Sequence, residues 1–366
     1  MDKKILDLYS DYLISSFSYT TATGLSAALD GQVSHDAVTR LLSGDELDSK
    51  QLWLLVKPMV RRYERDEAVI VFDDTIEEKP HTKESELVCW HHDHTKNRSV
   101  KGINLLNCLY KTDEVSFPLG FDLVKKPIEF SDIKTKKRKR KSITSKNELL
   151  RARLAVCQRN RIKYRYVLTD SWFASKENMD FIRHDLDKHF IMSMKTNRTV
   201  ALTEDDKKQG NFTRIDQLEW QEHTPVQAWI KGLDFPVLLH RQLFTNKDGS
   251  TGILYLACSD LTCDAAGIEA IYQKRWSVEV FHKTLKSNVG LAKSPTHCVR
   301  TQSNHVFMAI YAAFQLECLH LTHKMNHFAL RSKLNIGALQ QALKGLAELR
   351  GESVSCATVY FHSYVI

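Results

Sequence analysis

The sequence contains 366 residues, with 52 lysines and arginines against 44 aspartates and glutamates, so its formal net charge is +8. Hydrophobic residues make up 43% of the chain and charged residues 26%, a globular composition that excludes disordered, collagen-like and disulfide-scaffold proteins. At roughly 150 residues per domain, this length predicts two or three domains.

The sequence predicts neither a membrane span nor a secretion signal. No apolar run approaches the ~18 residues of a spanning helix, and the N-terminal segment lacks a signal-peptide core. The eight cysteines include no Cys-x-x-Cys pair, which favours reduced thiols over a disulfide framework or zinc site. We therefore expect a cytoplasmic protein with no membrane partner.

Residues 1–65 predict a helical domain. Short helices are expected at 22–29 and 34–42, joined by a tight turn at residues 30–32, with Ser34 as a helix N-cap. This is the layout of a helix-turn-helix, whose second helix can enter the major groove of DNA. A plain helical hairpin has the same pattern, so DNA contact by this segment stays open.

An α/β domain is predicted to follow at 66–196. Its elements are strands at 68–74, 99–110 and 115–124, a helix at 146–160, a strand at 164–170, a helix at 175–185 and a strand at 189–195. The order β-β-β-α-β-α-β is that of a ribonuclease-H-like domain, although other α/β folds share it.

The rest of the chain predicts an interrupted core and a helical tail. Short alternating segments at 197–262 indicate a β-rich insertion, after which a long helix from about 263 to 286 returns to the core, placed at 263–300. Residues 301–366 form a helical C-terminal region with apolar helices at 305–321 and 335–349.

The predicted helix at 271–287 carries a polar face. At about 100° per residue, Tyr272, Arg275, Glu279, Lys283 and Lys286 fall on one side. A solvated face with ion pairs such as Glu279 to Lys283 is one explanation. A site that uses the carboxylate and holds neighbouring phosphates with the other side chains is the second.

Further carboxylates end two predicted strands. Asp73 and Asp74 end the first strand of the core, and Asp170 ends the strand at 164–170. Two aspartates from adjacent strands and Glu279 from a helix would form an oxygen-only cage, which suits Mg²⁺ or Mn²⁺ rather than zinc. Two such ions can support an in-line phosphoryl transfer.

These residues resemble a known family. Tyr272, Arg275, Glu279 and Lys286 fit the Y-(2)-R-(3)-E-(6)-K pattern of bacterial DDE transposases of the IS-four family, within KRWSVEVFHKTLK. The motifs DDT at 73–75 and TDSW at 169–172 occur in the family's order, so the resemblance covers roughly residues 65–300.

The resemblance implies a role for each motif residue. Asp74 would bridge both metal ions, with Asp170 and Glu279 each completing one metal site. Asp73 is the rival to Asp74, because adjacent strand residues point to opposite faces. In similar enzymes, the residues that grip phosphates near the cleaved end correspond here to Tyr272, Arg275 and Lys286.

The resemblance also implies an activity. The protein would be a cut-and-paste DNA transposase that cleaves terminal inverted repeats and joins the freed 3′-OH to target DNA. It would use two Mg²⁺ or Mn²⁺ ions, act as a homodimer on double-stranded DNA, and associate with the bacterial nucleoid. A hairpin intermediate would need an aromatic side chain for a flipped base, for which Trp172, Trp220 and Trp229 are equal candidates.

Two further segments carry charge or metal-binding side chains. The basic run at 134–141, which contains Lys136, Lys137, Arg138, Lys139 and Arg140, favours a phosphate-binding loop over a generic solvated loop. The histidines at 91, 92 and 94 resemble a zinc cluster, but their spacing does not make them converge, and a DNA-facing hairpin fits better.

Two alternatives to a transposase remain. A ribonuclease-H-like DNA-binding protein or nuclease without transposition activity would share the fold, although all three acidic positions are present. A metallohydrolase using the histidines at 91–94 would not depend on Glu279.

Overall fold

The computed structural model describes residues 2–93, 96–133, 136–246 and 248–351. The chain forms two compact units. The first unit contains residues 1–42, 284–295 and 308–366, and the second contains residues 43–283 and 296–307.

The first unit is helical. Its helices are α1 (Lys3–Ser15), α2 (Ala22–Ala28), α3 (His35–Ser43), the later part of α10 (Val299–His323) and α11 (His327–Leu349). Leu6, Tyr9 and Leu13 of α1 are fully buried, and Asp7 accepts a hydrogen bond of 2.9 Å from the hydroxyl of Tyr311. The apolar side of α1 therefore contributes to the core of this unit.

The predicted helix pair near the N-terminus is confirmed. Thr21 caps α2, and Asp30 and Gly31 both have positive φ angles, of 49° and 75°, in the turn that follows. Ser34 Oγ then accepts from the backbone N–H of Ala37 at the start of α3. DNA contact by α3 remains a prediction.

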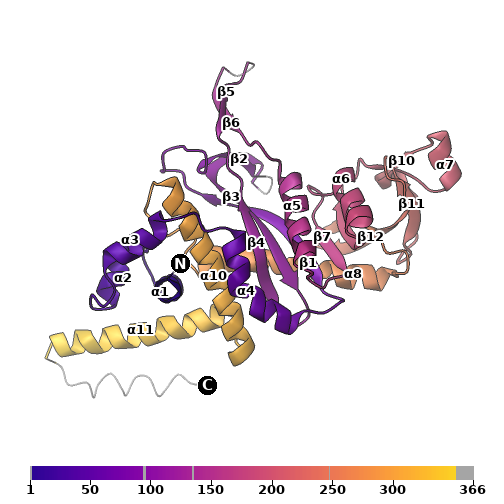
Figure 1. Cartoon of the computed structure of the whole chain (residues 1–366). Helices are drawn as coiled ribbons and strands as arrows, with labels where there is room; N and C mark the ends of the chain where they lie inside the picture. The colour runs from indigo at the N-terminus through magenta and orange to yellow at the C-terminus, as the bar shows by residue number, and fades with distance from the viewer. Residues whose placement is uncertain (1, 94–95, 134–135, 247, 352–366) are drawn as a thin grey trace. The chain divides into compact units, whose positions relative to one another are not determined.

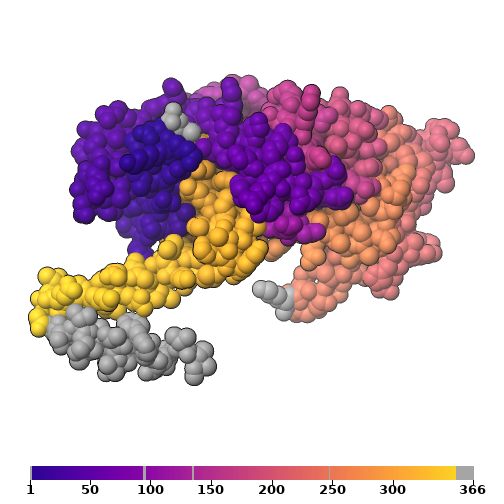
Figure 2. Space-filling model, turned by 60° about the horizontal axis from the view of Figure 1, so that its bottom comes forward, coloured from indigo at the N-terminus to yellow at the C-terminus, as the bar shows by residue number. Residues whose placement is uncertain are grey.

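Helix α11 has an apolar exposed side. It is the yellow rod in Figure 2. Its exposed apolar side chains include Leu334, Ile336, Leu339, Leu343, Leu346 and Leu349.

The second unit is built on a large mixed sheet. Its strands are β1 (Val69–Glu78), β2 (Cys89–Asp93), β3 (Arg98–Lys111), β4 (Ser116–Leu123), β7 (Tyr166–Thr169), β8 (His189–Met194), β9 (Thr199–Ala201), β10 (Thr213–Arg214), β11 (Val226–Ile230), β12 (Val237–Thr245) and β13 (Thr251–Cys258). Its helices are α4 (Ser49–Tyr63), α5 (Lys146–Arg159), α6 (Lys176–Asp180), α7 (Glu204–Gln209), α8 (Ala265–Gln273) and α9 (Trp276–Ser287), the last of which ends in the first unit.

The centre of the sheet has the strand order β4-β3-β1-β7-β8. β3 is antiparallel to β1 and β4, whereas β7 is parallel to both β1 and β8. Residues 69–72 of β1 are fully buried, as expected for a strand covered on both faces. This order is compatible with the ribonuclease-H-like fold predicted from the sequence.

Residues 197–262 extend the same sheet. β13 pairs with β8, and β12, β11, β9 and β10 follow outwards, so the predicted β-rich segment continues the core sheet rather than forming a separate one (Figure 1). A π-helical turn at Phe181–Asp185 follows α6 and ends the predicted helix at 175–185.

The prediction of one continuous helix from 263 to 286 is wrong. The chain forms α8 and α9, separated by a turn at Lys274 and Arg275. The backbone N–H groups of residues 274, 275, 277 and 278 each bond to a carbonyl three residues back, which tightens the chain and reorients it. Arg275 therefore lies at a bend, before the helix that carries Glu279.

No helix among the described residues is long and apolar enough to cross a membrane. Each cysteine within the described ranges is a free thiol, as expected, and Cys356 lies outside them.

Candidate functional site

Two aspartates lie side by side where the parallel pairing of β1 and β7 ends. Val71 of β1 is paired with Leu168 of β7; two residues later, Asp73 lies within β1 and Asp170 directly follows β7. Because β1 continues to Glu78, the prediction that Asp73 and Asp74 end this strand is wrong. Because side chains alternate along a strand, this register places both carboxyl groups on one face of the sheet. Asp170 is close enough to raise the pKa of Asp73.

Asp73 and Asp74 have different partners on the two faces of β1. Asp74 Oδ1 lies 2.6 Å from Nζ of Lys146, the first residue of α5, and its Oδ2 accepts a 2.8 Å hydrogen bond from Asn104. Asp73 Oδ2 lies 3.1 Å from the guanidinium of Arg275, at the bend before α9. Asp74 thus faces α5, and Asp73 faces the α8–α9 segment.

Glu279 lies in the first turn of α9, on the face occupied by Asp73. Asp73, Glu279 and His282 each offer a ligand atom, and these atoms all lie within 4.8 Å of one another. His282 is buried, with Nε2 2.9 Å from the side-chain nitrogen of Asn107. Asn107 is paired with Asp73 across β1 and β3, so this contact fixes α9 beside the aspartate.

Burial raises the pKa of both aspartates. The pKa of Asp73 rises to about 7, chiefly through desolvation and then through the charge of Asp170, while Arg275 acts in the opposite direction. The pKa of Asp170 is also raised by burial, although the backbone N–H of Trp172 donates to its carboxylate at 3.1 Å. The cluster therefore retains a proton near neutral pH, which a bound cation would displace.

The donor set fits a hard divalent cation. Asp73 and Glu279 supply carboxylate oxygens, which Mg²⁺ and Mn²⁺ prefer, and His282 adds an imidazole nitrogen that Mn²⁺ accepts more readily than Mg²⁺. Asp170 is not in this group, although its charge acts on Asp73. Arg275 contacts two of these carboxylates, at 3.1 Å from Asp73 and 3.6 Å from Glu279. Part of the negative charge is thus already neutralised by the protein.

The other residues of the sequence motif lie at different depths. Tyr272 is buried, and its hydroxyl donates to the backbone carbonyl of Thr169 at 3.2 Å. Arg275 is mostly buried through its contacts with the carboxylates, whereas Lys283 and Lys286 are exposed on α9. Tyr272 therefore supports the strand that ends in Asp170 and is not presented to solvent.

The tryptophan nearest to the carboxylates in sequence is exposed. Trp172 has 42% of its surface accessible, and the ammonium groups of Lys146 and Lys195 lie 4.6 and 5.7 Å from its ring centre. Trp220 instead packs against Tyr255 in the β-rich segment, with ring centres 5.4 Å apart. An aromatic surface flanked by two cations thus adjoins the acidic cluster.

Residues 138–141 of the basic run form a strand rather than the predicted loop, and residues 134 and 135 lie outside the described residues. β6 (Arg138–Lys141) pairs with β5 (Ile128–Ser131) in a separate two-stranded hairpin that projects from the large sheet (Figure 1). Arg140 is ion-paired with Glu129, directly across the hairpin. Lys136, Lys137, Arg138 and Lys139 are exposed, although Lys139 pairs with Asp132 at 2.7 Å.

The histidines near residue 91 do not form a metal cluster among the described residues. His91 is buried, with Nε2 3.3 Å from the thiol of Cys89, and burial lowers its pKa to about 3. His92 is exposed on the opposite face of β2, and His94 lies outside the described residues. Neither of the two described histidines belongs to a group with metal-ligand spacing.

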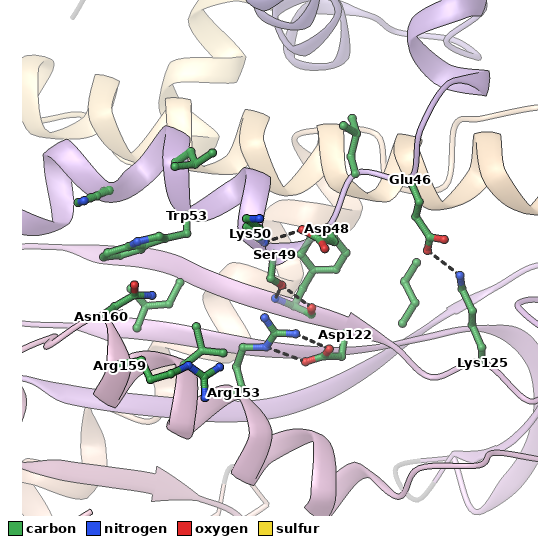
Figure 3. Close-up of a pocket in the computed structure, with 17 residues that line it drawn as sticks. Glu46, Asp48, Ser49, Lys50, Trp53, Asp122, Lys125, Arg153, Arg159 and Asn160 are labelled. Carbon is green, nitrogen blue, oxygen red and sulfur yellow. Dashed lines mark hydrogen bonds and ion pairs between the residues drawn. The ribbon is translucent and has the colours of Figure 1, made fainter. Parts of the chain in front are cut away.

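A separate hollow of about 720 Å³ lies between α4, β4 and α5 (Figure 3). Its main charged groups are paired: Arg153 binds Asp122 through two nitrogens, and Lys125 lies 2.6 Å from Glu46. No residue of the acidic cluster lines it.

Several residues of the site were not predicted from the sequence. Lys146 and Asn104 hold Asp74, while Asn107 and His282 join β3 to α9. His282 lies within the FHK portion of the motif, which was a usable signal. The other three are ordinary residues: the register of β1 and β3 brings Asn104 and Asn107 to the site, and Lys146 reaches it from the start of α5.

The large mixed sheet and the acidic cluster are compatible with one class of protein, the metal-dependent enzymes that act on phosphodiester bonds from a ribonuclease-H-like sheet. A family model described as DDE superfamily endonuclease matches residues 2–211, more than half of the sequence. The chain therefore belongs to the DDE superfamily endonucleases. Membership implies nuclease or transposase activity on DNA and the use of divalent metal ions. The match contains Asp73, Asp74 and Asp170 and ends before Glu279. No curated protein matches the chain.

Proposed function

We propose that the protein is a DNA transposase of the insertion-sequence type, resembling the IS-four family, that cleaves the ends of its element and joins them to target DNA. The observation that carries this proposal is the convergence of Asp73, Glu279 and His282 within 4.8 Å, beside Asp170. Family membership alone supports a DNA endonuclease. The Y-(2)-R-(3)-E-(6)-K motif adds the transposase assignment.

We propose Asp73, Asp170 and Glu279 as the metal-binding carboxylates. The sequence motif favoured Asp74, but the pairing of Asp74 with Lys146 and Asn104 supports Asp73 instead. When bound, two Mg²⁺ or Mn²⁺ ions would activate the attacking oxygen and stabilise the leaving oxygen of an in-line displacement.

The chain's own residues would orient this chemistry. Arg275 holds Asp73 and Glu279 together, and the bond between Asn107 and His282 fixes the helix that carries Glu279. Asp74 positions Lys146 by pairing with its ammonium group, which lies 4.6 Å from the ring centre of Trp172. Trp172 is the aromatic side chain that we propose for stacking an unpaired base near the cleaved end.

DNA would be held by exposed basic side chains. We propose that Lys283 and Lys286 of α9 contact phosphates near the carboxylates, and that Lys136, Lys137, Arg138 and Lys139 of the projecting hairpin contact a more distant part of the duplex. Arg140 supports this hairpin through Glu129. Synapsis of two element ends requires at least two protomers, so we propose a homodimer on DNA in the bacterial nucleoid.

The test is cleavage of DNA that carries the terminal inverted repeats flanking the coding sequence, in Mg²⁺ or Mn²⁺. Asp170→Asn and Glu279→Gln should abolish end cleavage while DNA binding is retained. Asp205→Asn, which removes an exposed carboxylate of α7 that belongs to no group with metal-ligand spacing, is the matched control and should cleave normally. Cleavage without any joining to target DNA would indicate a nuclease, and end binding without cleavage would indicate a DNA-binding protein.

A further inference from the structure

The amino ends of β7 and β8 carry a group of basic residues that no part of the proposed catalytic site uses. Arg161, Lys163 and Arg165 lie in the turn between α5 and β7, and Lys188 and His189 lie where β8 begins. Because the two strands are parallel and paired at Tyr166 and His189, these turns are neighbours.

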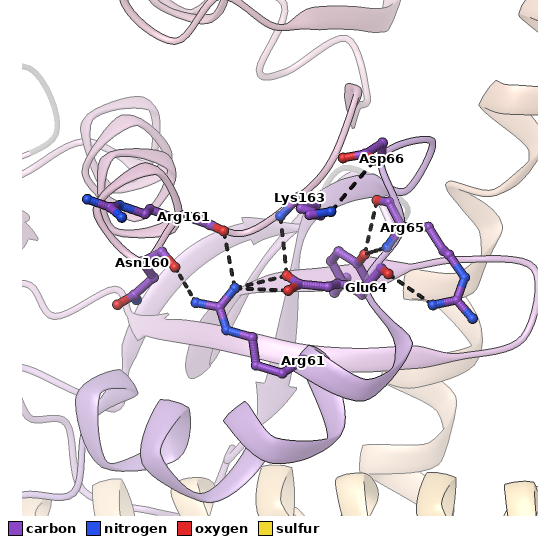
Figure 4. Close-up of polar contacts among 8 residues, drawn as sticks. Arg61, Glu64, Arg65, Asp66, Asn160, Arg161 and Lys163 are labelled. Carbon is purple, nitrogen blue, oxygen red and sulfur yellow. Dashed lines mark hydrogen bonds and ion pairs between the residues drawn. The ribbon is translucent and has the colours of Figure 1, made fainter.

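Arg61 of α4 and Glu64, which directly follows α4, bind the first turn (Figure 4). Arg161 has a φ angle of 52°, and its carbonyl accepts from the guanidinium of Arg61 at 3.1 Å, as does the carbonyl of Asn160. Glu64 pairs with the same guanidinium at 2.9 Å and accepts from the backbone N–H of Lys163. Two carbonyl groups and one N–H of the turn are thereby hydrogen-bonded, and the Arg161 side chain makes no ion pair within the described part of the chain.

The second turn is built in the same way. Asp187 has a φ angle of 50°, and the guanidinium of Arg183 donates to the carbonyl of Lys188 at 2.8 Å. The ammonium of Lys188 lies 5.4 Å from the ring centre of the buried Tyr164, without an acidic partner among the described residues. Each turn thus combines a left-handed residue, an arginine bonded to its carbonyl groups and a basic side chain left available.

A hollow of about 590 Å³ lies between the two turns. Four cationic side chains line it, from Arg161, Lys163, Arg165 and Lys188, against the carboxylates of Asp66 and Asp187. Lys163 is only 3.8 Å from the exposed Asp66, and such a surface pair is weak, whereas Arg165 binds the buried Asp260 at 2.8 Å. The hollow is therefore electropositive, with Arg161, Lys163 and Lys188 as its available cations.

We propose that this hollow is a second DNA-binding site, in which Arg161, Lys163 and Lys188 contact backbone phosphates. This proposal rests on the proposed function, because it assigns another contact with the same class of substrate. The ordered turns favour a binding site, since the backbone from which these cations project is held before DNA arrives and less backbone entropy is lost on binding than in a mobile loop. Phosphate contacts of this kind position DNA without reading its sequence.

The site lies at the opposite ends of the strands from the carboxylates. Arg165 and Asp170 bracket β7, and a strand of that length places them ~16 Å apart. The hollow therefore cannot contact the phosphate being cleaved. It suits a segment of DNA beyond that phosphate, or a second duplex.

The experiment measures binding of double-stranded DNA by fluorescence anisotropy in EDTA, so that no catalysis is needed. The test variant combines Arg161→Asn, which tolerates the positive φ angle, with Lys163→Gln and Lys188→Gln. The expected result is a roughly ten- to hundredfold weaker affinity and a log–log salt slope smaller by about 2 to 3. Asp66→Asn, which removes an opposing charge at an exposed position, should strengthen binding.

The matched control combines Lys208→Gln, Lys333→Gln and Lys344→Gln, which remove the same charge from exposed helix positions, and should change the salt slope by less than 1. Equal effects in both triple variants, or none in the first, would overturn the proposal. Inorganic phosphate is the second probe, and it tests whether the hollow binds free anions rather than DNA. If phosphate raises the Tm of the wild type but not that of the test variant, while both proteins bind DNA with equal affinity, the DNA assignment is wrong. End cleavage by the test variant at saturating DNA shows independently whether the proposed function stands.

Discussion

Arg275 and Asp73 form an ion pair of 3.1 Å that joins the turn before α9 to the middle of β1. The same guanidinium lies 3.6 Å from Glu279, so a single side chain contacts two of the three carboxylates proposed as metal ligands. Both members of the Arg275–Asp73 pair are mostly buried, with 17% and 14% of their side chains exposed. This contact orients the strand aspartate and the helix glutamate toward the same volume.

The two adjacent aspartates of β1 should respond differently to substitution. Asp73→Asn removes a proposed metal ligand and should reduce end cleavage by about a thousandfold, because metal coordination supplies several kcal/mol of transition-state stabilisation. Asp74→Asn loses only its contacts with Lys146 and Asn104 and should retain measurable cleavage. Initial rates at saturating DNA make the comparison. A more severe loss in Asp74→Asn than in Asp73→Asn would reverse the assignment.

The stability of the metal-free protein should fall as pH rises toward 7. The pKa of Asp73 is raised to about 7 by burial, above the value near 4 expected in the unfolded chain, so the folded state retains the proton longer. Between these values, wild-type stability should fall by roughly 1.4 kcal/mol per pH unit from this group. Asp73→Asn lacks this loss. In urea unfolding in EDTA, the stability of the variant relative to the wild type should therefore increase from pH 5 to pH 7. A difference independent of pH would contradict the raised pKa.

The contact between Asn107 and His282 should position Glu279. Asn107→Ala removes a buried hydrogen bond of 2.9 Å and should cost about 1–3 kcal/mol of unfolding free energy. It should also lower kcat more than DNA affinity, because α9 would lose its attachment beside Asp73. Asn104→Ala, which removes the bond to Asp74 on the other face, is the control. Equal effects on kcat from both variants would argue against a specific positioning role for Asn107.

Lys146 and Asp74 should behave as one unit. Their side chains are 17% and 16% exposed and meet at 2.6 Å, so either Lys146→Met or Asp74→Asn leaves a partly buried charge unpaired. Each single variant should lose about 1–3 kcal/mol, and the double variant should lose less than the sum. Thermal and urea unfolding of the four proteins measures the coupling. Strict additivity would show that the pair contributes nothing of its own.

The sequence predicts much of the central sheet, because its strands are long, apolar and bounded by polar turns. Residues 69–72 of β1 form such a run, and the four-residue β7 was found from YVLTD despite its length. By contrast, no feature of the sequence predicts the break between α8 and α9. Neither glycine nor proline occurs at Lys274 or Arg275, and the bend depends on tertiary contacts such as that between Arg275 and Asp73.

The same reasoning explains the uncertainty over the first aspartate. Alternation along a strand predicts that Asp73 and Asp74 face opposite sides of the sheet. It does not predict against which side α9 packs. That depends on the partners Lys146 and Arg275, which lie 72 and 202 residues away in the sequence. The basic hairpin was missed for a related reason, because the pairing of Arg140 with Glu129 across β5 and β6 has no local pattern.

The most direct test of the metal site replaces each of the two proposed aspartate ligands by cysteine. Thiolate is a poor ligand for Mg²⁺ and a better one for softer ions such as Mn²⁺, so Asp73→Cys and Asp170→Cys should cleave transposon ends with Mn²⁺ but not with Mg²⁺. Asp74→Cys should show no such change in metal preference. If Asp73→Cys and Asp170→Cys show the wild-type preference, or if Asp74→Cys alone switches to Mn²⁺, then Asp73 and Asp170 do not hold the metal ions as proposed.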